Sequence, residues 1–401
     1  MPRPGKTRVQ VRLVGVTMAN PMHRDSGPGN LFDLAVFVGR FQPFHKGHLM
    51  VVREALARAR HVLIVLGSSG AARRPDHLPF TDAERTEMIL GCLTPEEQAR
   101  VSLRGCEDRG NITLWTEAVQ ALADETLARI GLADQARVTL IGHSKDRSSY
   151  YLRAFPRWAA IDVPKQATAS ATEIRQAYFD EHQARVDAYL AGPAKDALPA
   201  PVLAWLTAFR GTPAYGDLVE EWAFVKAYRR TWDAAPYPPI FVTADAVVVQ
   251  GANILLIQRR ARPGKGLWAL PGGFVEQDEF LADAALRELR EETRLRVPEA
   301  ILRGSIVATR VFDAPYRSMR GRTITHATLF HLQPKAPERR PGEPEMDPAK
   351  LQAALALPRV KGADDAQHAR WWPLEKVARS MMFEDHYAVI QTMKALIPTS
   401  E

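Results

Sequence analysis

The chain has 401 residues, which at roughly 100–200 residues per domain corresponds to two or three domains. Apolar residues make up 46% and charged residues 25% of it, a balance that excludes wholesale disorder and a fibrous repeat. No run approaches the roughly 18 uncharged apolar residues that span a bilayer, so we predict no membrane partner. Two cysteines, Cys92 and Cys106, exclude a disulfide framework and a zinc ribbon and indicate a reducing, cytoplasmic location.

The formal net charge is +7, from 53 Lys and Arg residues against 46 Asp and Glu residues. The basic residues are spread thinly, which favours small phosphorylated substrates over a nucleic-acid partner. Before Asp25 all charged residues are basic, and no apolar run there is long enough for a signal peptide. Residues 1–30 are therefore predicted to be a flexible N-terminal extension, or partly an upstream stretch before a true start at Met18 or Met22.

Buried strands and amphipathic helices alternate between residues 31 and 180. Apolar strands without alternation, each followed by a helix, are typical of a parallel sheet covered on both faces. We therefore predict an α/β domain over residues 31–180. The predicted elements are strand 34–38, helix 51–60, strand 61–67, helix 82–91 and strand 137–142.

The pattern changes twice in the rest of the chain. Residues 181–235 favour helices without a strand, and the proline-rich segment PYPP (236–239) marks a boundary. Residues 236–401 are predicted to form an unrelated α+β domain with a mixed sheet, and we expect the two halves to be chemically independent. The elements predicted there are strands 241–250 and 253–260, helix 280–293, strands 301–311 and 323–332, and an exposed loop at 333–350.

The first candidate site is the sequence GRFQPFHKGH (39–48), which follows the first strand. His45 and His48 fall three residues apart at a helix start, on one face. A helix N-terminus carries free N–H groups and about half a positive charge, so it can seat a phosphate, and Gly47 would let that phosphate approach the backbone. For an HxxH pair alone, two surface histidines are the simpler interpretation, and zinc is disfavoured because no third ligand is suitably spaced.

The segment GRFQPFHKGH resembles the (H/T)xGH signature of the nucleotidylyltransferase superfamily, and specifically of nicotinamide-nucleotide adenylyltransferases. Three further segments resemble that family in order: LPFTDAERTEMI (78–89), IGHSKDRSSYYLRAFPRW (141–158) and SATEIR (170–175). The resemblance implies a Rossmann-like domain that joins ATP and nicotinamide mononucleotide into NAD and pyrophosphate. The attacking phosphate is already anionic, so catalysis is positioning plus charge neutralisation.

The resemblance also assigns roles to residues of this site. His45 and His48 would hold the ATP phosphates, bridged by Mg²⁺ or Mn²⁺, while Arg175 would act from the opposite side. Trp115 is either a stacking partner for the nicotinamide ring or an ordinary core tryptophan, and the pair 145–146 is either a ligand pair at a strand end or a solvated loop. The predicted nucleotide- or substrate-binding residues are Gly39, Arg40, Phe41, Gly47, Thr81, Arg85, Asn111, Trp115, Gly142, Lys145, Asp146, Ser170 and Thr172.

The second candidate site consists of Glu288, Glu291 and Glu292, whose spacing places them on one helical face. Such close like charges repel one another, and a divalent cation that prefers oxygen ligands would turn them into a site. The alternative is a solvated acidic face. The stretch GGFVEQDEFLADAALRELREETRL (272–295) resembles the Nudix box, Gx5Ex7REUxEExGU, except that Arg294 replaces a glycine. Because that glycine usually ends the helix in a left-handed conformation, we expect a disturbed helix end.

The second resemblance implies a Nudix-fold hydrolase, an α/β/α sandwich. Its metal ligands, for Mg²⁺ or Mn²⁺, would be Glu288, Glu291, Glu292 and the carbonyl of Gly272. The segments 312–330 and 360–374 resemble the Nudix half of bifunctional enzymes that hydrolyse ADP-ribose to AMP and ribose 5-phosphate. Two arginines there are either substrate-positioning groups or surface residues, namely Arg320 and Arg322.

The predicted small-molecule partners are therefore ATP, nicotinamide mononucleotide, NAD and ADP-ribose. One alternative is a transferase for another substrate, such as phosphopantetheine, joined to a general nucleotide-sugar hydrolase. Another is an ADP-ribose sensor, which should have lost the box glutamates and gained a DNA-binding module. The sequence leaves open a homo-oligomer, the relative rates of the two sites, Mg²⁺ against Mn²⁺, and nicotinamide against nicotinate mononucleotide.

Overall fold

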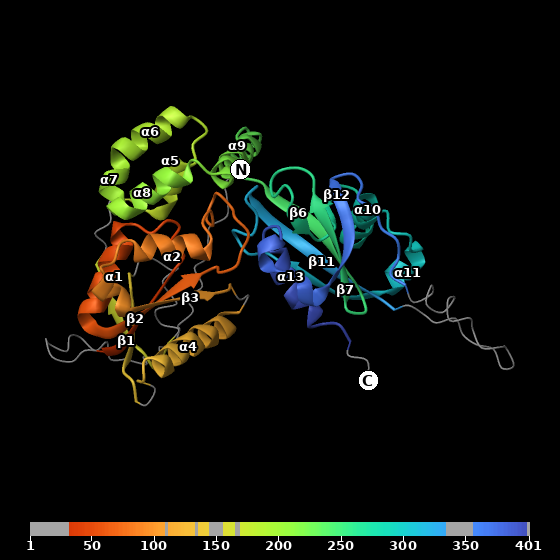
Figure 1. The fold of residues 1–401 in the computed structure, drawn as a ribbon. Helices are drawn as coiled ribbons and strands as arrows, with labels where there is room; N and C mark the ends of the chain where they lie inside the picture. The colour runs from red at the N-terminus through yellow and green to blue at the C-terminus, as the bar shows by residue number, and fades with distance from the viewer. Residues whose placement is uncertain are drawn as a thin grey trace, which may run out of the picture.

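The chain folds into two lobes (Figure 1). The computed structural model describes residues 32–108, 111–132, 135–143, 155–164, 169–333 and 356–398. Within these ranges no helix has the length and apolar character to cross a membrane. Several predictions fall outside the described residues: the extension 1–30, all but the first residue of the loop 333–350, and the pair Lys145 and Asp146.

The first lobe is built on a five-stranded parallel sheet with the strand order β3-β2-β1-β4-β5. The three predicted strands and the parallel arrangement are confirmed. β3 and β5 were not predicted, because the sequences VSLRGC and AAID are short and only partly apolar. The strands are β1 (Phe32–Gly39), β2 (Ala59–Gly67), β3 (Val101–Cys106), β4 (Val138–Gly142) and β5 (Ala159–Asp162).

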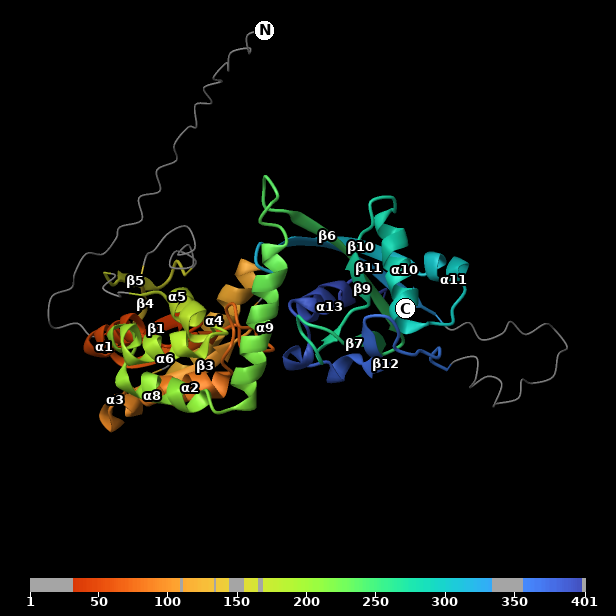
Figure 2. The ribbon, with the colours of Figure 1, turned by 90° about the horizontal axis from the view of Figure 1, so that it is seen from above.

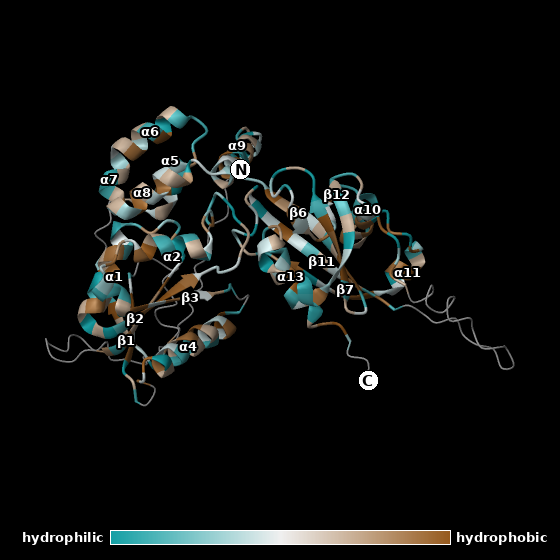
Figure 3. Cartoon of the chain, viewed as in Figure 1, coloured by the Kyte–Doolittle hydropathy of each residue, from teal (hydrophilic) through white to brown (hydrophobic). Residues whose placement is uncertain are grey.

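Helices cover both faces of this sheet. Neighbouring residues of β2 point to opposite layers: Ile64 packs with Val52 of α1, whereas Leu63 packs with Val119 of α4. Two apolar clusters on either side of one sheet explain why its strands are continuously hydrophobic, as Figure 3 shows for β2. The helices are α1 (Lys46–Arg58), α2 (Asp82–Leu90), α3 (Pro95–Ala99), α4 (Ile112–Arg129) and α5 (Ala171–Tyr178).

Residues 181–235 form helices, as predicted, and they share the apolar core of the first lobe. Val202, Leu206 and Trp222 belong to the same cluster as Phe80 and Met88. The last of these helices, α9, lies between the two lobes (Figure 2). The helices are α6 (Gln183–Ala191), α7 (Pro193–Ala197), α8 (Ala200–Phe209) and α9 (Pro213–Arg230).

The second lobe is built on a mixed seven-stranded sheet of order β10-β11-β6-β7-β12, to which β8 and β9 add beside β7 and β6. β11 and β6 are parallel, and the other pairs are antiparallel. α10 covers one face, where Leu286 packs with Val248, and α13 covers the other, where Val389 packs with Val249. The strands are β6 (Ile240–Gln250), β7 (Asn253–Arg259), β8 (Trp268–Ala269), β9 (Gly272–Phe274), β10 (Ile306–Phe312), β11 (Arg322–Leu332) and β12 (Ala366–Pro373).

The prediction of a strand over 301–311 is wrong in its first part. Residues 299–304 form a short helix with Pro298 at its N-cap, and β10 begins only at Ile306. At the end of α10, Arg294 adopts the left-handed conformation, with φ 48° and ψ 32°, so the helix ends as it would with glycine. The helices are α10 (Leu281–Thr293), α11 (Glu299–Gly304) and α13 (His386–Lys394), with 3-10 turns at Leu374–Lys376 and Arg379–Met381.

Candidate functional site

The loop after β1 turns sharply because of one glycine. A Cβ on Gly39 would lie 2.7 Å from the ring of Phe41, so any other residue there would push that ring away. Phe41 is buried with φ 51°, an unusual conformation for an aromatic residue, and its ring lies edge-on to His48 at 5.0 Å. The turn therefore delivers the chain from the end of the strand directly to the two histidines.

The two histidines form the N-terminus of α1. The His48 N–H donates to Nδ1 of His45 at 3.4 Å, and the His45 N–H donates to Nδ1 of His48 at 3.3 Å. Their rings stack with centroids 3.6 Å apart. Because both Nδ1 atoms accept hydrogen bonds, the neutral rings carry their protons on Nε2, the form that donates to an anion. The predicted pairing of the histidines on one face is confirmed, and Gly47 lies in the same turn.

Arg175 lies on α5, at the end of the segment SATEIR (170–175), and its side chain contacts the loop between β1 and α1. Its Nη1 donates to the carbonyl of Gln42 at 2.6 Å, its Nε to the carbonyl of Asp76 at 2.9 Å, and its Nη2 to Oγ1 of Thr172 at 3.2 Å. Burial, followed by the nearby charge of Arg40, lowers the pKa of Arg175 to about 10. Arg175 thus stays positive at neutral pH, and with Arg40 it gives the loop a positive field.

Ser170 and Gly142 each lie at the end of a helix or strand. The Ser170 hydroxyl caps α5 by accepting the Glu173 N–H at 3.3 Å. Gly142 is the last residue of β4, the strand next to β1. Both residues therefore lie at the ends of elements, α5 and β4, that are next to the loop between β1 and α1.

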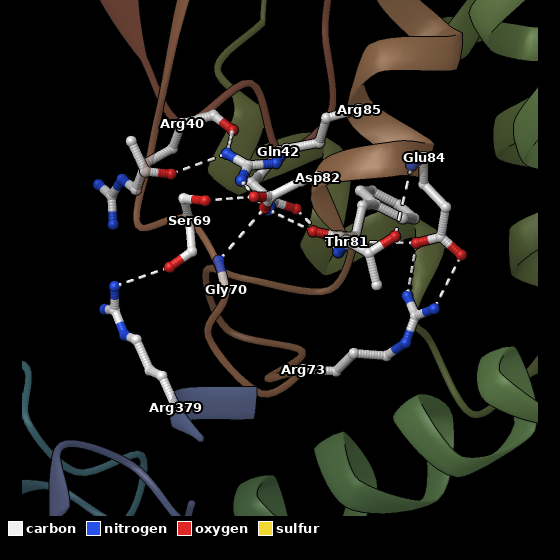
Figure 4. Close-up of polar contacts among 12 residues, drawn as sticks. Arg40, Gln42, Ser69, Gly70, Arg73, Thr81, Asp82, Glu84, Arg85 and Arg379 are labelled. Carbon is white, nitrogen blue, oxygen red and sulfur yellow. Dashed lines mark hydrogen bonds and ion pairs between the residues drawn. The ribbon is translucent and has the colours of Figure 1, made fainter. Parts of the chain in front are cut away.

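The segment 78–89 supports this loop through hydrogen bonds, among them those that Figure 4 shows from Arg85. Gln42 and Phe80 exchange two hydrogen bonds, of 2.7 and 2.9 Å. Arg85 is only 1% exposed, and its Nη1 donates to the carbonyls of Arg40 and Gly67, both at 2.8 Å. The Thr81 hydroxyl caps α2, accepting the Glu84 N–H at 3.3 Å. Arg85 thus holds the backbone of the loop and Thr81 begins the helix that carries Arg85, while their binding of a ligand stays a prediction.

The remaining predicted residues of the first site lie along α4. Asn111 caps this helix, and its Oδ1 accepts the Thr113 N–H at 2.7 Å. Trp115 is half-buried, with its ring edge-on to Phe155 at 5.9 Å, and packs against the core on that side of the sheet. Part of the Trp115 side chain thus belongs to the apolar core, as the interpretation of an ordinary core tryptophan predicts.

In the second lobe, two box glutamates lie against β9. Glu292 is 3% exposed, and its Oε2 accepts the Gly272 N–H at 2.9 Å. A Cβ on Gly273 would lie 2.3 Å from Oε1 of Glu288, so glycine is needed for this close approach. Burial raises the pKa of Glu292 to about 8 and also raises the pKa of Glu288. Glu288 and Glu292 are therefore largely withdrawn from solvent, unlike the residues of a solvated acidic face.

Arg287 neutralises part of the acidic cluster. It donates to Glu279 at 2.7 Å, to Glu288 at 2.9 Å and to Glu291 at 3.1 Å. In the ranges that the structure describes, no three His, Cys, Asp or Glu side chains converge to hold a metal ion. Glu291 is the most exposed of the three glutamates, whereas Glu288 is mostly covered beside Gly273 and Glu292 is buried beside Gly272. The pKa values of Glu288 and Glu292 stay raised despite the nearby arginine, and a hard divalent cation would stabilise their charged forms.

Asp245 belongs to this site and was missed by the sequence analysis. It is buried in β6, its Oδ2 accepts the Thr325 hydroxyl at 2.5 Å, and a Cβ on Gly272 would lie 2.3 Å from its Oδ1. Burial raises the pKa of Asp245, and the charge of Arg317 opposes that rise. The signal that could have revealed it is a lone carboxylate inside the apolar strand FVTADAVVVQ.

The two predicted arginines have different surroundings. The guanidinium carbon of Arg320 lies 4.9 Å from the centre of the Phe274 ring, directly after the box glycines. Its Nε is buried and has no hydrogen-bond partner among the described residues. Arg322 instead bonds the carbonyl of Asp313 and so closes the base of the loop between β10 and β11. Arg320, but not Arg322, therefore lies beside β9, the strand that begins the Nudix box.

Both lobes match known protein families. Residues 36–177 match the cytidylyltransferase-like family, and residues 239–393 match the NUDIX domain family. The nicotinamide/nicotinic acid mononucleotide adenylyltransferase of Acinetobacter baylyi is 40% identical over 150 residues, which are 37% of this chain and 77% of that protein. The ADP-ribose pyrophosphatase of Methanocaldococcus jannaschii is 40% identical over 84 residues, which are 21% of this chain and 46% of that protein.

Solved structures of a Francisella tularensis protein are similar to this chain across both lobes. One is the crystal structure of a bifunctional NMN adenylyltransferase/ADP ribose pyrophosphatase from Francisella tularensis, complexed with AMP and a manganese ion. The two proteins are 34% identical, the match covers 91% of this chain and 99% of that one, and the TM-score is 0.76. The chain therefore belongs to the family of bifunctional nicotinamide mononucleotide (NMN) adenylyltransferase/ADP-ribose pyrophosphatases.

Proposed function

We propose that this chain synthesises NAD in its first lobe and hydrolyses ADP-ribose in its second. The first reaction transfers the adenylyl group of ATP to NMN and releases pyrophosphate; the second gives AMP and ribose 5-phosphate. The observation that carries the proposal is that each motif closes within its own lobe: His45, His48 and Arg175 around one loop, and Glu288 and Glu292 against one strand. We assign residues 31–180 to the transferase, 181–235 to its helical extension and 236–401 to the hydrolase.

In the transferase, positive groups surround the place where negative charge builds up. The Nε2 protons of His45 and His48 and the N-terminus of α1 would bind the triphosphate. Arg175, with Ser170 and Thr172 on the same helix, would hold the leaving pyrophosphate from the other side. No residue need act as a base, because the attacking oxygen of NMN belongs to an ionised phosphate. Trp115, Asn111 and Gly142 remain candidates for binding the mononucleotide, as do Lys145 and Asp146.

In the hydrolase, the proposed metal ligands are the carboxylates of Glu288 and Glu292 and the carbonyl of Gly272. A divalent cation bound there would neutralise the pyrophosphate and acidify water. Arg287 holds Glu288 in place and keeps Glu291 at the margin, where Glu291 would orient the attacking water. Arg320 would bind the anionic or aromatic part of the substrate beside Phe274, and Mg²⁺ or Mn²⁺ would serve at both sites.

The test is a substrate panel with the purified full-length chain. ATP is supplied with NMN, nicotinate mononucleotide or phosphopantetheine, and in separate reactions ADP-ribose, NADH or a nucleotide sugar is supplied with Mg²⁺ or Mn²⁺. We expect NAD from ATP and NMN, and AMP with ribose 5-phosphate from ADP-ribose. Turnover of phosphopantetheine instead of a mononucleotide, or of nucleotide sugars in preference to ADP-ribose, would contradict the proposal.

A further inference from the structure

The loop between β10 and β11 is anchored in the opposite lobe. Met319, near the end of this loop, is 2% exposed and lies in the apolar cluster that contains Trp222 and Val225 of α9. A hydrolase residue is therefore part of the core of the transferase lobe. The loop cannot move away from α9 without exposing this side chain to water.

Two arginines of the first lobe also hold the backbone of this loop. Arg74 donates from Nη1 to the carbonyl of Arg317 at 3.2 Å and from Nη2 to the carbonyl of Tyr316 at 3.5 Å. Arg229, near the end of α9, donates from both Nε and Nη2 to the carbonyl of Met319, at 2.8 and 2.5 Å. All four bonds come from charged donors, but the two from Arg229 are shorter and meet on one oxygen, so the bond pair at Met319 is the firmest of these contacts.

The peptide held by Arg229 immediately precedes Arg320. On its other side, the Met319 N–H donates to Oε1 of Glu384 at 2.9 Å, so contacts from both lobes fix this residue. The Arg320 side chain itself rests on the Phe274 ring, and no described residue accepts a hydrogen bond from its Nε. The direction of Arg320 toward the box strand thus depends on the backbone that carries it.

We propose that Arg229 is a positioning residue for ADP-ribose hydrolysis: by holding the Met319 carbonyl, it fixes Arg320 beside the Nudix box. This inference rests on the proposed role of Arg320 in substrate binding. Arg229 touches no substrate and acts only through Arg320, so its loss weakens substrate binding more than it slows chemistry. The hydrolase is then completed by the helical extension of the transferase, which departs from the expectation of two chemically independent halves.

The experiment compares Arg229→Ala, Arg229→Lys and Arg320→Ala in the full-length chain, with both activities measured well below the unfolding temperature. Arg229→Ala should raise KM for ADP-ribose about tenfold, the cost of a lost hydrogen bond from a charged group, with little change in kcat. Arg229→Lys should recover part of that loss. Arg230→Ala removes the neighbouring arginine, which is exposed as Arg229 is but does not hold the loop, and should change nothing. NAD synthesis should be normal in all four variants.

The double variant Arg229→Ala/Arg320→Ala separates the two claims. If Arg229 acts through Arg320, the double variant hydrolyses ADP-ribose no worse than Arg320→Ala. Normal hydrolysis by Arg320→Ala would remove Arg320 from the site and the inference with it. An impaired Arg320→Ala beside a normal Arg229→Ala would overturn only the positioning role. Equal losses of NAD synthesis and hydrolysis in Arg229→Ala would show general damage to the fold and would also overturn it.

Discussion

Gly39 shows how a single residue shapes the loop between β1 and α1, which carries His45. Gly39→Ala would place a Cβ 2.7 Å from the buried Phe41 ring, so we expect a loss of about 1–3 kcal/mol in the free energy of unfolding, as for other overpacked sites. NAD synthesis should fall, because the displaced ring also contacts His48, while hydrolysis should persist. Denaturant unfolding and both activity assays measure these effects.

A second glycine provides the matched control. In α9, nothing lies within 4 Å of a Cβ built on Gly216, so Gly216→Ala should raise the free energy of unfolding by about 0.5–1 kcal/mol. NAD synthesis should be unchanged in this variant. If Gly39→Ala behaved like Gly216→Ala, the close approach at the loop would not matter.

Glu292 should make the metal-free stability depend on pH. Its folded pKa is about 8, against 4.5 for an ordinary Glu, so the folded state holds a proton that the unfolded state has lost between these values. The stability that this proton contributes is complete below about pH 4.5, declines as the pH rises, and is lost above about 8. Glu292→Gln should remove that decline and be more stable than wild type at pH 8 without metal.

Added metal should reverse the order of stability of wild type and Glu292→Gln. A divalent cation stabilises the fold that presents its site, so Mn²⁺ without ATP should raise the melting temperature of wild type at pH 8 but not that of Glu292→Gln. Glu375→Gln, at an exposed glutamate, should respond to Mn²⁺ as wild type does. Equal shifts in wild type and Glu292→Gln would exclude Glu292 as a ligand.

At the scale of elements, the end of α10 carries a measurable strain. Arg294 holds a left-handed conformation that glycine adopts without cost, so Arg294→Gly should raise the free energy of unfolding by about 0.5–1 kcal/mol. Arg296→Gly, two residues on, should lower it instead, because Arg296 is not among the residues with positive φ. Denaturant midpoints of the two variants measure the difference, and a destabilised Arg294→Gly would show that the Arg294 side chain is needed there.

Elements with strong patterns were predicted well, and those with weak patterns were not. The continuously apolar strands β1 and β2 and the amphipathic helix α10 appear close to their predicted bounds. β5, with only four residues, carried too little pattern to be recognised. The sequence of α11 predicts a strand, because its few apolar residues run directly into those of β10.

Site residues that belong to a sequence motif could be predicted. Those whose role depends on tertiary contacts could not. The two histidines stack, Arg175 reaches their loop and Glu292 lies against β9, while the ligands of these residues stay predictions. Thr81 and Arg85 matched a motif, but their contacts are those of a helix cap and a loop support. Within a motif, the sequence cannot tell a residue that binds a ligand from one that positions its neighbours.

At the scale of the whole molecule, several contacts between the described parts of the two lobes run from arginines to backbone carbonyls. Arg379 of the hydrolase donates to the carbonyl of Ser69 at 2.9 Å, beside the loop support of the transferase (Figure 4), and pairs with Asp108 at 2.7 Å. Arg262 reaches Glu221 of α9 at 3.1 Å. A carbonyl acceptor leaves no trace in the sequence, so this interface could not be predicted from residue patterns.

The chain carries two distinct proposed active sites, and the most direct test is to inactivate each site separately. His48→Ala and Glu292→Gln are made in the full-length protein, and NAD synthesis and ADP-ribose hydrolysis are measured for both. His48→Ala should lose about 10²–10³-fold in NAD synthesis, comparable to removing one transition-state donor, and keep its hydrolysis. Glu292→Gln should lose hydrolysis by orders of magnitude and keep NAD synthesis. Loss of both activities in either variant, or of neither, would contradict the account.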